Sequence, residues 1–362
     1  MDPVTRRTFL QTTAAAATVM ALPSLGKGWY ALAGGADAAY FEREFGITDA
    51  LCRKVLAQAL AKGGDFAELY FEHTVSNWLG LEDGKVNRAF GQVDLGVGIR
   101  TVAGDQIGYG FTQQLDEASM LAAAATAATI ANGSATAPAA ALAWGKVGSY
   151  YPLDRLISEV PLEPKVQLVQ SLNERCFAGS KLIAKVTAQL HDQQKRILIV
   201  TSDGVKVEDL QPRVYLTATV VAEKDGKRER AGWNYGGRRS LSFFTPEVVA
   251  DIARQATDRA LIMFEAVPAP AGEVPVVLGP GVTGVLLHEA IGHGMEADFN
   301  RKGMSTYATM IGRKVAEPFV TLTVKPKGDA LRPRTMAGGD HSTREELTLP
   351  AGVTARFVGP TV

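Results

Sequence analysis

The chain has 362 residues, and its 38 lysines and arginines balance its 38 aspartates and glutamates. A protein that binds nucleic acid through electrostatics carries a basic excess or basic stripes, so the balanced charge argues against a nucleic-acid partner. Apolar residues make up 46% of the chain and only two cysteines occur, Cys52 and Cys176. This composition excludes a disordered protein, a disulfide scaffold and a metal site built from four cysteines.

The first 33 residues have the layout of an export signal. Arg6 and Arg7 precede an uncharged, alanine-rich run over residues 12–26, and a small-x-small sequence follows at residues 31–33. The segment resembles a twin-arginine (Tat) signal, which predicts a periplasmic or other extracytoplasmic protein; an accidental Arg-Arg pair is the alternative. The apolar run is too short to span a bilayer, so we expect no permanent membrane anchor. Removal of residues 1–33 leaves 35 basic and 37 acidic residues, a net charge of −2.

Residues 45–133 predict a first domain of helices and β-hairpins. We expect helices over residues 51–61 and 116–132, each followed by glycine. Asp83-Gly84 and Gly104-Asp105 are typical of tight hairpin turns. The flanking apolar runs predict strands over residues 67–73, 76–82, 85–90, 94–102 and 106–112.

Residues 155–266 predict a second domain of the same kind. A helix is expected over residues 164–177, and Thr245-Pro246-Glu247 favours the start of another that runs to Phe264. Five strands are expected between these helices, over residues 182–191, 196–201, 205–209, 214–222 and 228–235. Consecutive hairpins indicate an α+β fold with antiparallel or mixed sheets and packing helices, and exclude a doubly wound nucleotide-binding fold.

The candidate chemistry lies in a third segment, residues 272–323. A strand over residues 274–278 and a glycine-rich turn precede a helix that holds two of the five histidines in the chain, His288 and His293, beside Glu289. Imidazole is the commonest zinc ligand, and a neighbouring carboxylate can act as general base on a metal-bound water. The alternative is one buried histidine that packs in a core and one solvent-exposed histidine.

The spacing of these histidines constrains the helix that carries them. Five residues on a regular α-helix correspond to about 140° of rotation and ~7.5 Å of rise, too divergent for two bonds of about 2 Å to one ion. A π-helical turn, with about 4.4 residues per turn, reduces the offset to roughly 50°. We therefore predict a widened helix at residues 290–292, with Gly292 where the distortion costs least.

The sequence of residues 288–303 is His-Glu-Ala-Ile-Gly-His-Gly-Met-Glu-Ala-Asp-Phe-Asn-Arg-Lys-Gly. It resembles the HExxxH signature of the TldD/PmbA metallopeptidases, on the TldD side. Ala297 stands where that family usually has glycine, and the resemblance extends over about residues 45–323. It implies a zinc peptidase in which His288 and His293 bind Zn²⁺ and Glu289 is the general base. It also implies peptide or unfolded substrates, and a homodimer or a heterodimer with a PmbA/TldE-like subunit.

Residues 324–362 depart from the pattern of that family. The resemblance implies a long C-terminal domain that supplies a cysteine as the third zinc ligand. This segment is rich in Pro, Gly and Thr, poor in predicted strands and free of cysteine. We therefore expect a truncated or frameshifted chain with an incomplete C-terminal domain and no family counterpart for this tail. The alternatives for function are another two-histidine metal hydrolase, a non-catalytic subunit of a protease heterodimer, or an inactive remnant.

Other polar residues carry weaker predictions. Glu296 and Asp298 can orient a ligand histidine, although acids just after a helix are usually solvated. We expect structural or solvated roles for the three remaining histidines, His73, His191 and His341. We expect Cys52 and Cys176 to be buried thiols, and a disulfide between them is the alternative in an oxidising compartment.

Overall fold

The computed structural model describes residues 39–82, 84–134, 139–145, 151, 153–277, 285–286, 288–310, 312–315, 321–324 and 354–357. The chain divides into two compact units, residues 1–267 and 268–362. The expected signal, residues 1–33, lies outside the described residues. No helix in the described part of the chain is long and apolar enough to cross a membrane.

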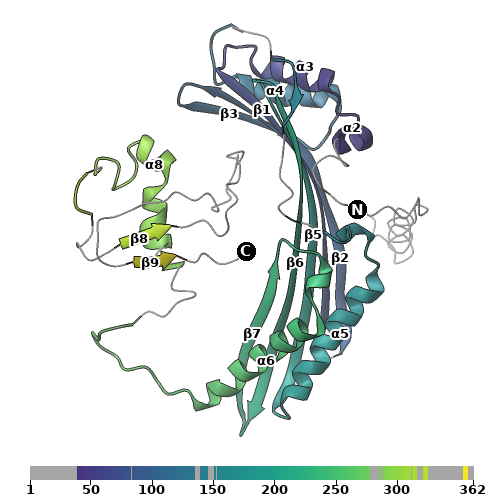
Figure 1. Ribbon diagram of the computed structural model, residues 1–362, viewed down its shortest axis with the longest axis vertical. Helices are drawn as coiled ribbons and strands as arrows, with labels where there is room; N and C mark the ends of the chain where they lie inside the picture. The colour runs from purple at the N-terminus through teal and green to yellow at the C-terminus, as the bar shows by residue number, and fades with distance from the viewer. Residues whose placement is uncertain are drawn as a thin grey trace, which may run out of the picture. The chain divides into compact units, whose positions relative to one another are not determined.

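One curled seven-stranded sheet runs through the first unit (Figure 1). Its strand order is β3-β2-β1-β5-β6-β4, with β7 also paired to β6, and every pair is antiparallel except β4 with β6. The strands are β1 (Phe66–Glu82), β2 (Lys85–Ala103), β3 (Gln106–Thr112), β4 (Ala143–Trp144), β5 (Ile183–Thr201), β6 (Val205–Lys224) and β7 (Lys227–Gly237). The predicted α+β class, with antiparallel or mixed sheets and packing helices, is confirmed.

The long strands are continuous where the sequence predicted breaks. β1, β2, β5 and β6 each join two strands that were predicted as separate, because polar residues interrupt the apolar pattern at their middles. At the predicted break in β5, residues 192–195, polar side chains pair across the sheet with β1. The Asn77 amide donates to Asp192 at 2.8 Å, and the Gln193 amide donates to the Ser76 hydroxyl at 3.0 Å. The prediction of breaks was wrong because polar groups that satisfy one another can remain within a sheet.

Two apolar cores lie on one face of this sheet, one toward each end. Side chains alternate between the faces of a strand, so Phe71 of the first core and Leu79 of the second, eight residues apart on β1, point the same way. Leu198 of β5 packs in the first core although it belongs to the second predicted domain. The regions 45–133 and 155–266, predicted as two domains, therefore share one sheet and contribute strand ends to each other's core.

Helices cover both cores, α3 and α4 at one end of the sheet and α5 and α6 at the other (Figure 1). Side chains cap three of them: Thr48 accepts from Leu51 N–H, Asp116 from Ser119 N–H, and Thr245, which the sequence predicted at a helix start, from Val248 N–H. The helices are α2 (Tyr40–Phe45), α3 (Asp49–Ala59), α4 (Glu117–Ala128), α5 (Leu162–Gly179) and α6 (Pro246–Ile262), with 3₁₀ turns at Ile157–Glu159, Leu241–Phe243 and Met263–Glu265.

The two cysteines lie in different cores. Cys52 belongs to the first core and Cys176 to the second, and both are free. Burial raises the pKa of each thiol to about 12, so neither is a thiolate at neutral pH. The prediction of buried thiols is confirmed, and the alternative of a disulfide between them is wrong.

The second unit contains short elements. A π-helical turn (His288–Gly292) is followed by a 3₁₀ turn (His293–Met295) and α8 (Ala297–Arg301), and β8 (Thr321–Val324) pairs in parallel with β9 (Thr354–Phe357). β9 thus lies in the tail that was predicted to be poor in strands. The strand predicted over residues 274–278 is wrong for residues 274–277, which are irregular, with Val277 97% exposed. A strand needs a neighbour for its backbone groups, and among the described residues none pairs with this segment.

A buried ion pair near the middle of the sheet provides a test of this fold. Lys165 Nζ lies 2.9 Å from Asp192 Oδ2, and their side chains are only 8% and 1% exposed. We expect Lys165→Met to lower the free energy of unfolding by about 3–5 kcal/mol, because Asp192 remains as an unpaired buried charge. Urea denaturation monitored by circular dichroism measures the change.

The matched control is Lys185→Met, because Lys185 pairs with Glu82 on the same sheet but is 45% exposed. We expect that variant to stay within about 1 kcal/mol of wild type. The double variant Lys165→Met/Asp192→Leu should recover most of the loss, since it removes both charges. A loss in Lys165→Met no larger than that of the control would contradict a desolvated pair.

Candidate metal site

The HExxxH motif forms a π-helical turn. The turn spans His288–Gly292, and a 3₁₀ turn begins at His293. This confirms the widened helix that the five-residue spacing required, although the turn begins at His288 and not at residue 290. The wider turn rotates the second histidine back toward the first, as a regular α-helix would not.

The turn brings three potential ligands together. One donor atom from each of His288, Glu289 and His293 lies within 4.8 Å of the others, and the two imidazole centroids are 4.4 Å apart with their planes at 70°. His293 Nε2 lies 3.5 Å from Glu289 Oε2. The histidines are half-buried and Glu289 is exposed, so a substrate can approach the carboxylate.

This donor set fits a divalent metal that prefers nitrogen and oxygen. Two metal–nitrogen bonds of about 2.0–2.1 Å at a tetrahedral centre place the nitrogens roughly 3.3 Å apart. The donor atoms of the observed group lie within 4.8 Å of one another. Within the described part of the chain it is the one set of three His, Cys, Asp or Glu residues that meets such a distance criterion.

Gly292 lies at the end of the π turn. Its backbone has φ −58° and ψ −51°, ordinary helical values that any residue adopts. A Cβ added at Gly292 would lie 3.6 Å from His288 Nδ1, which is van der Waals contact with the ring. Neither the backbone conformation nor the space at this position requires glycine, so the expectation that Gly292 is where the widened turn costs least gains no support from the structure.

Glu296 contacts the second histidine. Its Oε1 lies 2.9 Å from His293 Nδ1, on the other ring nitrogen from the one that faces Glu289. This is the contact proposed for a residue that orients a ligand, and it came from the two acids that the sequence singled out. The side chain of Asp298 lies outside the described residues.

Three further residues hold the segment after the motif, and the sequence analysis missed them. The Asn300 amide donates to the backbone carbonyls of Gly294 at 3.0 Å and Glu296 at 2.8 Å, and the Ser305 hydroxyl also donates to the Gly294 carbonyl. A Cβ on Gly294 would meet the Tyr307 ring at 2.6 Å. The signature over residues 288–303 includes Asn300 but not Ser305 or Tyr307, so it gave a signal for Asn300 alone.

The described histidines of the first unit have structural roles, as predicted. The Tyr40 hydroxyl hydrogen-bonds to His73 Nδ1 at 2.7 Å, and His191 stacks on Trp78 with ring centroids 4.6 Å apart. Burial lowers the pKa of both imidazoles, which favours their neutral form. His341 lies outside the described residues.

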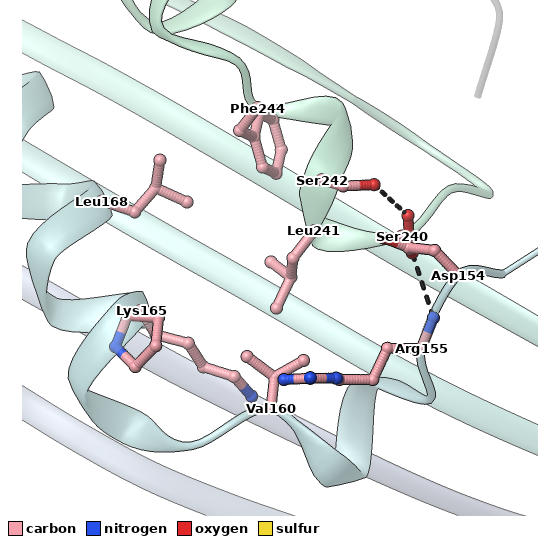
Figure 2. A pocket seen from close by; sticks show the side chains of 10 residues that line it. Asp154, Arg155, Val160, Lys165, Leu168, Ser240, Leu241, Ser242 and Phe244 are labelled. Carbon is pink, nitrogen blue, oxygen red and sulfur yellow. Dashed lines mark hydrogen bonds between the residues drawn. The ribbon is translucent and has the colours of Figure 1, made fainter. Parts of the chain in front are cut away.

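A cavity of about 420 Å³ lies between α5 and the Leu241–Phe243 turn in the first unit, and Figure 2 shows the side chains that line it. Several of its polar groups have partners within the lining or nearby. Arg155 N–H donates to Asp154, hydrogen bonds from Ser240 and Ser242 lower the pKa of Asp154, and Lys165 pairs with Asp192. The lining has no histidine or cysteine, so it offers no alternative site for the predicted chemistry.

Comparison with known proteins identifies the family. Three domain profiles match in order: PmbA/TldA metallopeptidase domain 1 over residues 67–131, the central domain over 155–264 and the C-terminal domain over 271–344. Together they cover more than half of the chain. The chain belongs to the PmbA/TldD metallopeptidase family. The last match includes the π turn and overlaps the first part of the segment 324–362.

Similar proteins agree with this assignment. A protein of Haemophilus influenzae named metalloprotease TldD homolog is 37% identical over 266 residues, which cover 71% of this chain and 55% of that protein. The chain thus spans about half the length of the curated relatives it matches. Two solved structures share the fold at low identity. A Thermotoga maritima protein described as a modulator of a DNA gyrase gives a TM-score of 0.63 at 17% identity, over 85% of this chain and 71% of that one. TldE from Thermococcus kodakarensis gives a TM-score of 0.58 at 16% identity, over 85% of this chain and 70% of that one.

Proposed function

We propose that this protein is a zinc-dependent metallopeptidase of the TldD type that hydrolyses peptides or unfolded segments. The observation that carries the proposal is the π turn, which gathers His288, Glu289 and His293 within 4.8 Å of one another. The name metalloprotease carried by its relatives supports a metal-dependent hydrolysis. Imidazole nitrogens favour zinc over calcium or magnesium, which prefer sets of oxygen ligands.

In this proposal each residue of the turn has one role. His288 and His293 hold the metal, and zinc bound there would polarise the scissile carbonyl and acidify a water. Glu289 takes a proton from the attacking water and delivers it to the leaving amine, as a general base that then acts as general acid. Its exposed position beside His293 Nε2 leaves room for both water and substrate.

A non-catalytic subunit of a protease heterodimer is the second candidate. The observation that favours it is the ligand set: the described cluster offers two imidazoles and one carboxylate, and both cysteines lie in the cores of the first unit. A catalytic zinc site normally has three protein ligands and a water, so two histidines alone bind zinc weakly. Metal content therefore distinguishes the two candidates.

The first prediction concerns metal binding and cleavage together. We expect the wild-type protein to bind close to one zinc per chain, measured by plasma mass spectrometry after dialysis, and to cleave a quenched fluorescent peptide. Glu289→Gln should keep the zinc and lose about 10²- to 10⁴-fold in cleavage rate, because it removes only the proton transfer. His288→Ala and His293→Ala should lose both.

The control is Glu273→Gln, which changes an exposed acid of the same unit outside the cluster. It should match wild type in both measurements. Wild-type protein without bound metal would favour the non-catalytic subunit. Cleavage that survives Glu289→Gln would exclude Glu289 as the base.

We propose that the partner is a second copy of this chain or a TldE-like subunit. The similarity of fold to TldE supports the TldE-like subunit as the partner. Light scattering coupled to size-exclusion chromatography should give twice the 38.5 kDa mass of the chain, less the signal where it has been removed, or the mass of a mixed pair when a TldE-like protein is co-expressed. Monomeric protein under both conditions would contradict it.

We further propose export through the twin-arginine route. The support is the order of the Arg6-Arg7 pair, the apolar run and the small-x-small sequence in the first 33 residues. In a bacterial host with this pathway, an epitope-tagged chain should appear in the periplasmic fraction, and Arg6→Lys/Arg7→Lys should remain in the cytoplasm. Equal distribution of the two forms would count against the signal.

A further inference from the structure

We infer that Glu296 is a positioning residue that fixes the orientation and the tautomer of His293, and that Asn300 holds Glu296 in place for this task. The inference rests on the proposed function, since His293 must present one defined nitrogen to a metal. It assigns a role to two residues that lie outside the HExxxH hexad.

The two ring nitrogens of His293 face different partners. Nδ1 lies 2.9 Å from Glu296 Oε1, whereas Nε2 lies 3.5 Å from Glu289 Oε2 in the cluster with His288. The ring is therefore held between two carboxylates on opposite sides. Only Nε2 faces the His288 and Glu289 side chains, with which it would bind a metal.

This arrangement selects one tautomer. A carboxylate is only a hydrogen-bond acceptor, so the short contact to Glu296 requires a proton on Nδ1. In a neutral imidazole the proton on Nδ1 leaves the lone pair on Nε2, the nitrogen that faces the cluster.

Backbone contacts fix the position of Glu296. The Asn300 side chain donates to the Glu296 carbonyl at 2.8 Å and to the Gly294 carbonyl at 3.0 Å, and Asn300 N–H donates to the Glu296 carbonyl at 3.1 Å. Ser305 gives Gly294 a second donor. One amide side chain thus ties the backbone on both sides of Met295, between the histidine and the acid that bonds to it.

The geometry also argues against Glu296 as a metal ligand. Its carboxylate sits on the Nδ1 side of His293, and the group of ligand atoms within 4.8 Å of one another contains Glu289 and does not include Glu296. Its contribution is therefore exerted through the imidazole. Removal of the carboxylate should weaken metal binding without removing a metal bond.

The first experiment reads the tautomer in metal-free protein. In full-length protein with ¹⁵N-labelled histidine, long-range ¹H–¹⁵N spectra distinguish protonated from unprotonated ring nitrogens, and His293→Gln identifies the signal. At alkaline pH we expect wild-type His293 to carry its proton on Nδ1. Glu296→Ala should give a mixture of tautomers, whereas Glu296→Gln, whose amide oxygen can still accept, should keep the wild-type form.

The second experiment measures zinc affinity by competition with a chromogenic chelator. Glu296→Ala should weaken binding about 10- to 100-fold, the range typical of residues that orient a metal-binding histidine. Glu296→Gln should recover most of that loss. Asn300→Asp, which keeps the shape but loses the amide donor, should change affinity in the same direction by less, and Glu273→Ala should not change it.

The outcomes separate this inference from the proposed function. An unchanged tautomer and an unchanged zinc affinity in Glu296→Ala would overturn the positioning role, even when wild-type protein binds zinc and cleaves peptides. Wild-type protein that binds no zinc would overturn the proposed function, whereas the metal-free spectra would still decide whether Glu296 sets the tautomer. Equal losses in Glu296→Gln and Glu296→Ala in both measurements would also reject the role, since they would show that the acceptor is not what matters.

Discussion

The π-helical turn at His288–Gly292 is the constraint on which the candidate site depends. Two histidines five residues apart diverge by about 140° on an α-helix, and the wider turn removes most of that divergence. The observed imidazole centroids are 4.4 Å apart. Because His288 and Glu289 lie in the π turn and His293 follows it directly, the local backbone brings the ligands and the base together.

A widened turn needs support, since π-helical segments are rare and their hydrogen bonding is less favourable than that of an α-helix. Here the support lies directly after the motif. The Gly294 carbonyl accepts from the side chains of Asn300 and Ser305, and the Glu296 carbonyl accepts from both the backbone and the side chain of Asn300. The close approach of Tyr307 to Gly294 explains why that position has no side chain. The same residues that satisfy the backbone also place the Glu296 carboxylate against His293.

Sequence patterns predicted those parts of the structure that local chemistry determines. Thr245-Pro246 marked the start of α6, where the Thr245 side chain accepts from Val248 N–H, and the hairpin turn at Gly84, with φ +72°, lies where Asp-Gly predicted it. The metal cluster was predictable for the same reason, because the spacing of His288 and His293 admits few backbone geometries that bring both to one ion.

Features that depend on partners far away in the chain were not predictable. The polar middles of β1 and β5 look like breaks in a single strand, and only their pairing, for example Ser76 with Gln193, shows why the sheet continues through them. The contact of Ser305 with Gly294 likewise depends on the path of the chain after α8. Residues 274–277 have the composition of a strand but no described neighbour, so their sequence misled.

The account's central claim is that His288 and His293 hold one metal ion on this turn. X-ray absorption spectroscopy of the zinc-loaded, full-length protein tests it most directly, because the outer-shell scattering of imidazole rings counts the histidines bound to each zinc. The account predicts two imidazoles per zinc, with nitrogens at about 2.0–2.1 Å, and one imidazole in His293→Ala. Zinc without imidazole ligands, or an unchanged spectrum in His293→Ala, would contradict it.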